Sequence, residues 1–165
     1  MIFGMSFYTF TLIHVIISLI GIATGLVVVY GMLTNNKMER WTAAFLISTV
    51  LTSVTGFGFP FTRLLPSHIT GIISLVVLVP AILAYYPFKL AGVWRLIYIV
   101  CGLIALWLNC FVAVVQAFLK IPALRALAPT QGEPPFLIAQ VAVLIIFIML
   151  GFLAVRKFHP LKGKV

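Results

Sequence analysis

The stretch FYTFTLIHVIISLIGIATGLVVVYGML, residues 7–33, contains no charged side chain and decides the class of fold. An α-helix needs about 20 apolar residues to cross a hydrocarbon core about 30 Å thick, so this stretch is long enough to span a membrane. The whole chain of 165 residues is 64% hydrophobic and 8% charged, with a mean hydropathy of +1.26. A water-soluble domain of this length cannot bury that much apolar surface, and we therefore expect lipid to be its solvent.

Four further apolar runs follow the first, and together the runs fill most of the chain. Their length and their lack of alternation favour helices over strands. The sequence therefore predicts an all-α, polytopic membrane helix bundle with five transmembrane helices in a single domain, residues 1–165. The alternative is a peripheral first helix beside four core helices. The five predicted helices are Phe7–Leu33, Trp41–Phe59, Ser67–Tyr86, Val93–Leu119 and Pro135–Val155.

The two acidic residues of the chain are Glu39 and Glu133, and both lie outside the apolar segments. Proton relays and cation sites within membranes usually depend on buried carboxylates. Their absence from the predicted helices argues against a small transporter coupled to protons or cations, which is the weakest of the three functional hypotheses below.

The basic residues indicate how the bundle is oriented. With five crossings, eight Lys and Arg residues fall on one side of the membrane and three on the other. The positive-inside rule then predicts an outer N-terminus and a cytoplasmic C-terminus. We interpret the basic tail as topogenic charge beside anionic lipid, and not as a nucleic-acid surface, because it is short and lacks interleaved aromatic residues. The larger set is Lys37, Arg40, Lys89, Arg95, Arg156, Lys157, Lys162 and Lys164, and the smaller set is Arg63, Lys120 and Arg125.

Polar side chains within the predicted helices gather in the outer half of the bundle. Polar groups in lipid are costly unless they pair with one another or line a cavity. Two interpretations stay open: a polar pocket that opens to the outer face, or hydrogen bonds that only join the helices. The candidate ligand-binding residues are His14, Thr52, Ser53, Thr55, His68, Asn109, Gln116 and Gln140, with Thr70 at the same level.

Three local patterns predict breaks or close contacts. The stretch TSVTGFGFP, residues 52–60, contains two glycines and a proline, so a regular helix is not expected to continue through it. Gly21 and Gly25 lie one helical turn apart and are expected to let another backbone approach within the bundle. Leu124 and Leu127, three residues apart, fit a short helix on the membrane surface.

Cofactor chemistry depends on few residues. His14 and His68 lie on different predicted helices and together offer the two axial imidazoles of a b-type haem. Asn109 and Gln116 are seven residues apart on one helical face and fit a quinone carbonyl or a polar lipid headgroup. A hydrogen-bonding role in helix packing is the competing interpretation for all four.

Motifs for metal, nucleotide or nucleophilic chemistry are missing from the sequence. It contains no His-Glu-x-x-His, no P-loop, no dinucleotide fingerprint and no nucleophile elbow. Cys101 and Cys110 are separated by about 13 Å of helical rise, so they cannot form a disulfide with each other. The sequence therefore leans away from an enzyme.

Several stretches of the chain carry a resemblance to a group of known sequences. The stretches at residues 115–136, 55–61 and 65–71, together with Leu108-Asn109, resemble a group of small, uncharacterised inner-membrane proteins of proteobacteria that have no assigned activity. The resemblance covers nearly the whole chain. It implies a bacterial cytoplasmic membrane and places any function in the outer polar residues and the outer loop.

Three functional hypotheses follow from the sequence. The first is a non-enzymatic membrane protein that binds a lipid-like ligand, or a membrane or periplasmic protein partner, through the outer polar pocket and the loop of residues 120–134. The second is an electron-transfer subunit that carries haem or quinone. The third is the small transporter.

Overall fold

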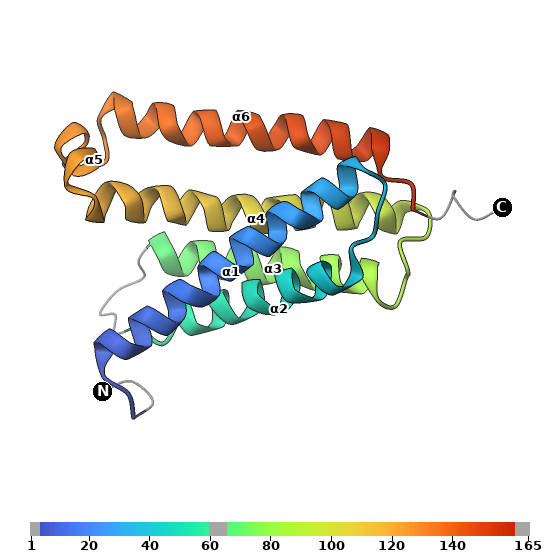
Figure 1. Ribbon diagram of the computed structural model, residues 1–165, viewed down its shortest axis with the longest axis horizontal. Helices are drawn as coiled ribbons and strands as arrows, with labels where there is room; N and C mark the ends of the chain where they lie inside the picture. The colour runs from blue at the N-terminus through green and yellow to red at the C-terminus, as the bar shows by residue number, and fades with distance from the viewer. Residues whose placement is uncertain (1–3, 60–65, 161–165) are drawn as a thin grey trace.

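A computed structural model describes residues 4–59 and 66–160, and its regular elements are α-helices that run up and down in turn (Figure 1). Each of the five predicted membrane segments forms a helix, so the all-α prediction is confirmed. A sixth, short helix lies in the connection between the last two. The helices are α1 Phe7–Leu33, α2 Glu39–Gly56, α3 Pro66–Tyr85, α4 Val93–Lys120, α5 Pro122–Leu127 and α6 Pro134–Lys157.

The second helix begins and ends earlier than the predicted 41–59. After Gly56 the backbone N–H of Phe57 bonds to the carbonyl of Val54 at 3.1 Å, and that of Gly58 bonds to Thr55 at 3.0 Å. These shorter-range bonds end the helix, as the glycine-rich stretch predicts. Pro60, the last residue of that stretch, lies outside the described residues. The short helix α5 lies at the position of the predicted surface helix.

Four helices form the body of the bundle. Helix α2 packs against α1 on one side and α3 on the other, and α4 contacts α1, α3 and α6. Helix α6 lies along α4 at the edge, with α5 at one end (Figure 1). We name the two ends of the bundle by their content: the α5 end, and the basic end, which holds the α1–α2 turn, the α3–α4 turn and the end of α6.

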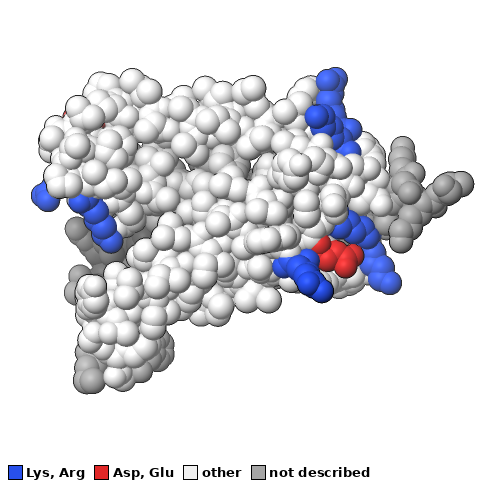
Figure 2. All heavy atoms as spheres, in the orientation of Figure 1, with Lys and Arg blue, Asp and Glu red and all other residues white. Residues whose placement is uncertain are grey.

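Four of the helices are long and apolar enough to cross a membrane: α1, residues 68–85 of α3, α4 and α6. On the face drawn in Figure 2, Lys and Arg side chains occur at the two ends, with an uncharged belt between them. Six described cationic residues lie at the basic end, and two, Lys120 and Arg125, lie at the α5 end. A charge-free belt between charged ends is the pattern expected of a protein whose middle lies in hydrocarbon.

Helix α2 is less apolar than the other long helices, because it carries Ser and Thr hydroxyls along its length. Those hydroxyls face inward: Thr42 and Thr49 are fully buried, and Ser48 and Ser53 nearly so. The outward side chains are apolar instead, and they include Ile47, which is 60% exposed, and Val54, which is 52% exposed. This polarity is the reverse of a helix on the surface of a water-soluble protein.

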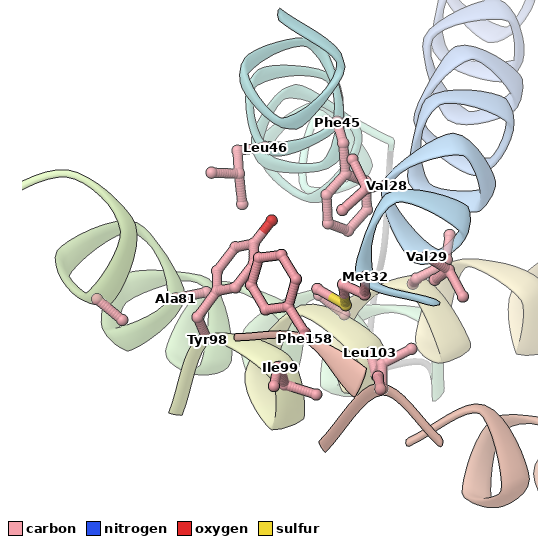
Figure 3. Close-up of a cluster of buried hydrophobic side chains, with 14 of the residues drawn as sticks. Val28, Val29, Met32, Phe45, Leu46, Ala81, Tyr98, Ile99, Leu103 and Phe158 are labelled. Atoms are coloured by element: carbon pink, nitrogen blue, oxygen red, sulfur yellow. The ribbon is translucent and has the colours of Figure 1, made fainter. Parts of the chain in front are cut away.

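The apolar core lies toward the basic end, where α1, α2, α3 and α4 converge (Figure 3). Tyr98 from α4 is buried there, and its hydroxyl points toward α2, where it lies 3.3 Å from the hydroxyl of Thr42. Gly25 is needed for this convergence. A Cβ atom on Gly25 would lie 2.5 Å from Cδ1 of Leu106 and 2.9 Å from Cδ2 of Phe45, so two side chains pack directly on this glycine. The approach of another backbone, which the sequence predicted, is not what these contacts show.

Helix α6 contributes least to the core. Only 6% of its apolar stretch is buried, against 28% for α1 and 44% for α4. The peripheral helix of this bundle is therefore α6, whereas the alternative prediction from the sequence was a peripheral first helix. The C-terminal end of α6 is fixed by the Arg95 guanidinium, which donates to the carbonyls of Val155 at 3.0 Å and Phe158 at 2.7 Å.

Candidate functional site

The eight candidate residues all lie in the half of the bundle nearer the α5 end. They come from five helices, whose alternating directions place the starts of α1, α3 and α6 beside the ends of α2 and α4 (Figure 1). Their side chains do not share one environment, however. They divide into small groups, each at a different contact between helices.

The first group joins α1 to the end of α2. Nδ1 of His14 lies 2.8 Å from the hydroxyl of Thr55, at hydrogen-bond distance. The imidazole ring also lies edge-on to the ring of Phe59, with 5.1 Å between the ring centroids. The Thr55 hydroxyl donates in turn to the carbonyl of Leu51 at 2.7 Å, so its proton is already used and the imidazole nitrogen is placed to donate.

The second group lies between α2 and α3. His68 is 3% exposed, and its ring is 5.9 Å from that of Phe57. Ser53 is buried and donates to the carbonyl of Thr49 one turn earlier at 2.9 Å. His14 and His68 thus lie against different aromatic residues, Phe59 and Phe57, on two helices that both pack against α2.

The third group lies between α2 and α4, in the interior. The Asn109 amide donates to the hydroxyl of Thr49 at 3.4 Å. Gly21 of α1 faces the same place, since a Cβ atom there would lie within 3.4 Å of both groups. A glycine at this position lets α1 cover the amide and the hydroxyl, so this group holds three helices together.

The fourth group joins α4 to α6. Gln140 is 8% exposed, and its Nε2 donates to the carbonyl of Phe111 at 3.2 Å. Gln116, two turns beyond Asn109 on α4, is exposed. The amide pair that the sequence grouped on one face therefore differs in burial: Asn109 points into the bundle, and Gln116 lies at its surface.

Three of these groups are hydrogen bonds between helices, at the α1–α2, α2–α4 and α4–α6 contacts. Such bonds are the second of the two interpretations that the sequence left open. Two described cavities lie elsewhere, and none of the eight residues lines either of them. The single outer pocket stays a prediction.

One of those cavities is an apolar groove of about 320 Å³ between α4 and α6. Its walls are aliphatic and aromatic, and Gly151 leaves space on the α6 side. The groove follows one face of α6, because its residues on that helix recur every three or four positions. The lining residues are Ile99, Val100, Leu103, Ile104, Trp107, Leu144, Phe147, Ile148, Gly151 and Val155.

Two buried polar atoms lie toward the α5 side of this groove, one on a lining residue and one on a residue a turn beyond the lining. Nε1 of Trp107, a lining residue, is buried and donates to no atom of residues 4–59 or 66–160. Gln140 lies one turn before Leu144 on the same face of α6, and its Oε1 is buried and accepts no bond from the same residues. One donor and one acceptor therefore remain at the α5 side of an otherwise apolar space.

The sequence indicated Gln140 as a candidate residue but did not indicate the groove or Trp107. Gly151 within a continuous apolar helix was the available signal, because a small residue there permits either close packing or a gap. Nothing in the sequence decides between the two, since the outcome depends on how α6 is placed against α4.

The fold and the charge distribution define this chain as a multi-pass, all-α membrane protein. Comparisons with protein-family models, with curated proteins and with solved structures found no match to it. Its function is therefore inferred from the geometry of its cavities and polar groups.

Proposed function

We propose that α2 is a fifth transmembrane helix, and that the bundle lies in a bacterial cytoplasmic membrane with its α5 end outside. The length of α2 supports a crossing, since 18 residues rise about 27 Å. The apolar outward face of α2, which packs between α1 and α3, also supports a crossing. The excess of cationic residues at the basic end favours a cytoplasmic C-terminus by the positive-inside rule. The resemblance to proteobacterial inner-membrane proteins supports the choice of membrane.

We further propose that the protein is a non-enzymatic binding protein for a lipid-like ligand that lies in the α4–α6 groove. The observation that carries this proposal is the α4–α6 groove with the unsatisfied donor of Trp107 on its lining and the unsatisfied acceptor of Gln140 one turn beyond Leu144. A buried polar group that forms no hydrogen bond typically costs about 1–3 kcal/mol. A ligand whose polar group accepts from Trp107 and donates to Gln140 removes that cost.

The shape of the groove selects an amphipathic molecule with a long apolar chain. The chain would lie between Leu103 and Gly151, where the walls are entirely apolar. The polar group would lie at Trp107, which is near the middle of α4 and at the end of the groove nearer α5. Ligand sites in membrane proteins with this division of character take lipids and isoprenoids, because the chain is supplied by the bilayer itself.

An isoprenoid quinone is the second candidate, and one observation favours it. The free donor on Trp107 suits a quinone carbonyl, and the free acceptor on Gln140 suits the hydroxyl of the reduced form. In this candidate the predicted quinone site is at the α4–α6 groove and not at Asn109 and Gln116. The haem hypothesis has no comparable support, because the rings of His14 and His68 pack against two different aromatic residues, Phe59 and Phe57.

The proposal is tested by mass spectrometry of organic extracts from detergent-purified protein. We expect one amphipathic class to be enriched over its share of the host lipids, and ultraviolet absorption distinguishes a quinone from a glycerolipid. The variant Gly151→Leu should lower the retained ligand at least about tenfold, equivalent to roughly 1.4 kcal/mol. A Cβ atom at position 151 meets Cδ1 of Leu103 at an ordinary 3.4 Å, so the larger side chain fills the groove without moving the backbone.

Ala142→Leu is the matched control, because Ala142 is exposed on α6 and does not line the groove. It adds apolar bulk on the same helix and should retain the ligand in full. Equal retention in the two variants, or extracts with the composition of the host membrane, would overturn the proposal.

A further inference from the structure

The larger of the two cavities lies at the basic end, and it is lined by other residues than the α4–α6 groove. It has a volume of about 520 Å³ and lies between the start of α2 and the turn that joins α3 to α4. We call it the basic cleft. The residues that line it are Lys37, Glu39, Arg40, Ala43, Tyr85, Tyr86, Lys89 and Leu90.

The basic cleft carries excess positive charge. Three of its side chains are cationic, Lys37, Arg40 and Lys89, and one is anionic, Glu39, so the formal balance is +2. The phenol of Tyr86 adds a hydrogen-bond donor, whereas the Tyr85 hydroxyl donates to the backbone carbonyl of Lys37 at 3.5 Å. Ammonium, guanidinium and phenol groups together suit an anion with several oxygen acceptors.

The depth of the cleft matches the headgroup layer of a bilayer. Aromatic residues surround the same end of the bundle: Trp41 and Tyr86 are about half exposed, and Trp94 stacks on Phe88 with a centroid distance of 3.8 Å. Trp and Tyr concentrate at membrane–water interfaces, where an apolar ring and a polar edge are both accommodated. The cationic groups therefore lie where lipid phosphates lie.

The two turns that present these cations adopt an uncommon backbone conformation. Met38 and Lys89, which are not glycines, have φ angles of 48° and 47°, and Leu90 has a φ of 62°. Leu90 is 2% exposed, so packing of this side chain holds the second turn in place. The lysine of that turn, Lys89, is thereby fixed at the rim of the cleft.

From this arrangement we infer that the basic cleft binds the phosphate group of an anionic phospholipid at the inner surface of the membrane. The cavity is large enough for a headgroup, three cations and the Tyr86 phenol line it, and the aromatic residues around this end of the bundle set its depth. Basic pockets between membrane helices on the cytoplasmic side are known to take anionic headgroups. This site is independent of the ligand proposed for the α4–α6 groove.

Native mass spectrometry of the detergent-purified protein, titrated with phosphatidylglycerol, tests the inference. The double variant Arg40→Gln/Lys89→Gln should bind this lipid roughly 30-fold more weakly, because each basic group near a lipid surface contributes about 1 kcal/mol. Zwitterionic phosphatidylcholine should bind weakly to both proteins. Titration with inorganic phosphate alone distinguishes a free anion from a headgroup: saturation by phosphate at lower concentration than the lipid would overturn the lipid assignment.

The double variant Arg156→Gln/Lys157→Gln is the matched control. It removes the same charge from the same end of the bundle, at exposed residues that do not line the cleft. The control should bind phosphatidylglycerol with less than about a twofold change, and an equal loss in the two double variants would contradict a defined site.

A second variant separates the cavity from its charge. Ala43→Phe fills the cleft and keeps all its charged groups, so we expect it to weaken binding of phosphatidylglycerol as well. Unchanged binding in Ala43→Phe, with circular dichroism confirming a folded protein, would overturn the inference.

Discussion

Helices α2 and α6 are built in opposite ways. Helix α2 is the least apolar of the five long helices, yet it lies between α1 and α3 in the body of the bundle. Helix α6 is the most apolar, yet only 6% of its apolar stretch is buried. The difference teaches that apolar content in this chain measures contact with lipid, whereas contact with protein is marked by hydroxyls, glycines and amides.

The physical reason is that an apolar side chain gains no hydrophobic free energy when it moves from lipid into a contact between helices. Helices in a bilayer associate through close packing and hydrogen bonds. Helix α2 supplies both, through its buried hydroxyls and through Phe45, which packs where α1 offers Gly25. Helix α6 supplies few such contacts, and hydrogen bonds near its two ends hold it beside α4.

The largest expected effect comes from truncating one leucine in each helix. Leu46 of α2 is 2% exposed, and Leu137 of α6 is 61% exposed. We expect Leu46→Ala to cost about 2–5 kcal/mol of unfolding free energy, because it opens a cavity in the core. Leu137→Ala should change it by no more than about 0.5 kcal/mol. Unfolding in mixed micelles with increasing dodecyl sulfate, followed by circular dichroism, measures both, and equal losses would break the comparison.

A smaller effect is expected at the basic end of α6. Arg95→Gln removes the guanidinium that donates to two carbonyls of the last turn, and hydrogen bonds from a charged group are worth about 1.5–3 kcal/mol. Hydrogen exchange should therefore quicken over residues 154–160. Arg156→Gln is the control, since Arg156 contacts the ring of Phe152 at 4.4 Å, a contact worth about 0.5–1 kcal/mol. Faster exchange in the control alone would show that α6 is held in another way.

At the α5 end, the Gln140 amide donates to the Phe111 carbonyl. This bond joins two uncharged groups, so it is weaker than the bonds that the Arg95 guanidinium donates at the basic end. Gln140→Leu loses this bond but also removes an unsatisfied acceptor, so we expect a stability change of about 0.6 kcal/mol or less. The same denaturation assay measures it, with the exposed Gln116→Leu as a reference. A loss above about 2 kcal/mol would mean that this amide, and not close packing, holds α6 to α4.

The smallest effect concerns the turn before α6. The Glu133 carboxylate accepts bonds from the Thr130 hydroxyl at 2.9 Å and from the Gly132 backbone N–H at 3.1 Å. Desolvation raises the pKa of this carboxyl, but these bonds and further backbone donors together hold the pKa below its ordinary value. A depressed pKa in the folded state means that the turn is stabilised above the ordinary pKa of glutamate and loses that stabilisation as pH falls through the folded value.

Amide hydrogen exchange at Thr130 and Gly132 checks this behaviour. After correction for the intrinsic dependence on pH, protection should fall in acid for the natural chain and should be low throughout for Glu133→Gln. A pH-independent difference between the two proteins would mean that the side chain acts by its shape and not by its charge.

The sequence was sufficient for the class of fold because the five apolar runs are long and separated by polar turns. It also predicted an irregular stretch within residues 52–60 and close packing at Gly25, since both depend on the local properties of glycine. It placed the end of the helix at Phe59 and not at Gly56, and it expected a backbone at Gly25 where side chains pack. It could not predict that α6 is the peripheral helix, because its pattern is apolar on every side and marks no buried face. The half-buried position of Asn109 and the exposure of Gln116 depend on where α2 and α6 lie against α4, and the spacing of the two residues does not contain that information.

The sequence predicted some of the candidate residues but not the cavities. The outer-level residues were found from their polarity and the alternation of helix directions. The groove and the basic cleft were missed because their walls come from elements distant in sequence. Lys37, Arg40 and Lys89 were assigned to topology, and the structure adds that they line one cavity.

The central claim, that a hydroxyl-rich α2 crosses the membrane, is tested most directly by sided cysteine labelling. Asn36→Cys and Gly132→Cys would each be made in a chain in which Cys101 and Cys110 are replaced by alanine. Both positions lie in turns at opposite ends of the bundle, and neither substitution removes a charge. If α2 crosses, an impermeant maleimide applied to intact cells labels position 132 and reaches position 36 only after the membrane is permeabilised. If the two positions are labelled together from one side, α2 does not cross and the five-helix account is wrong.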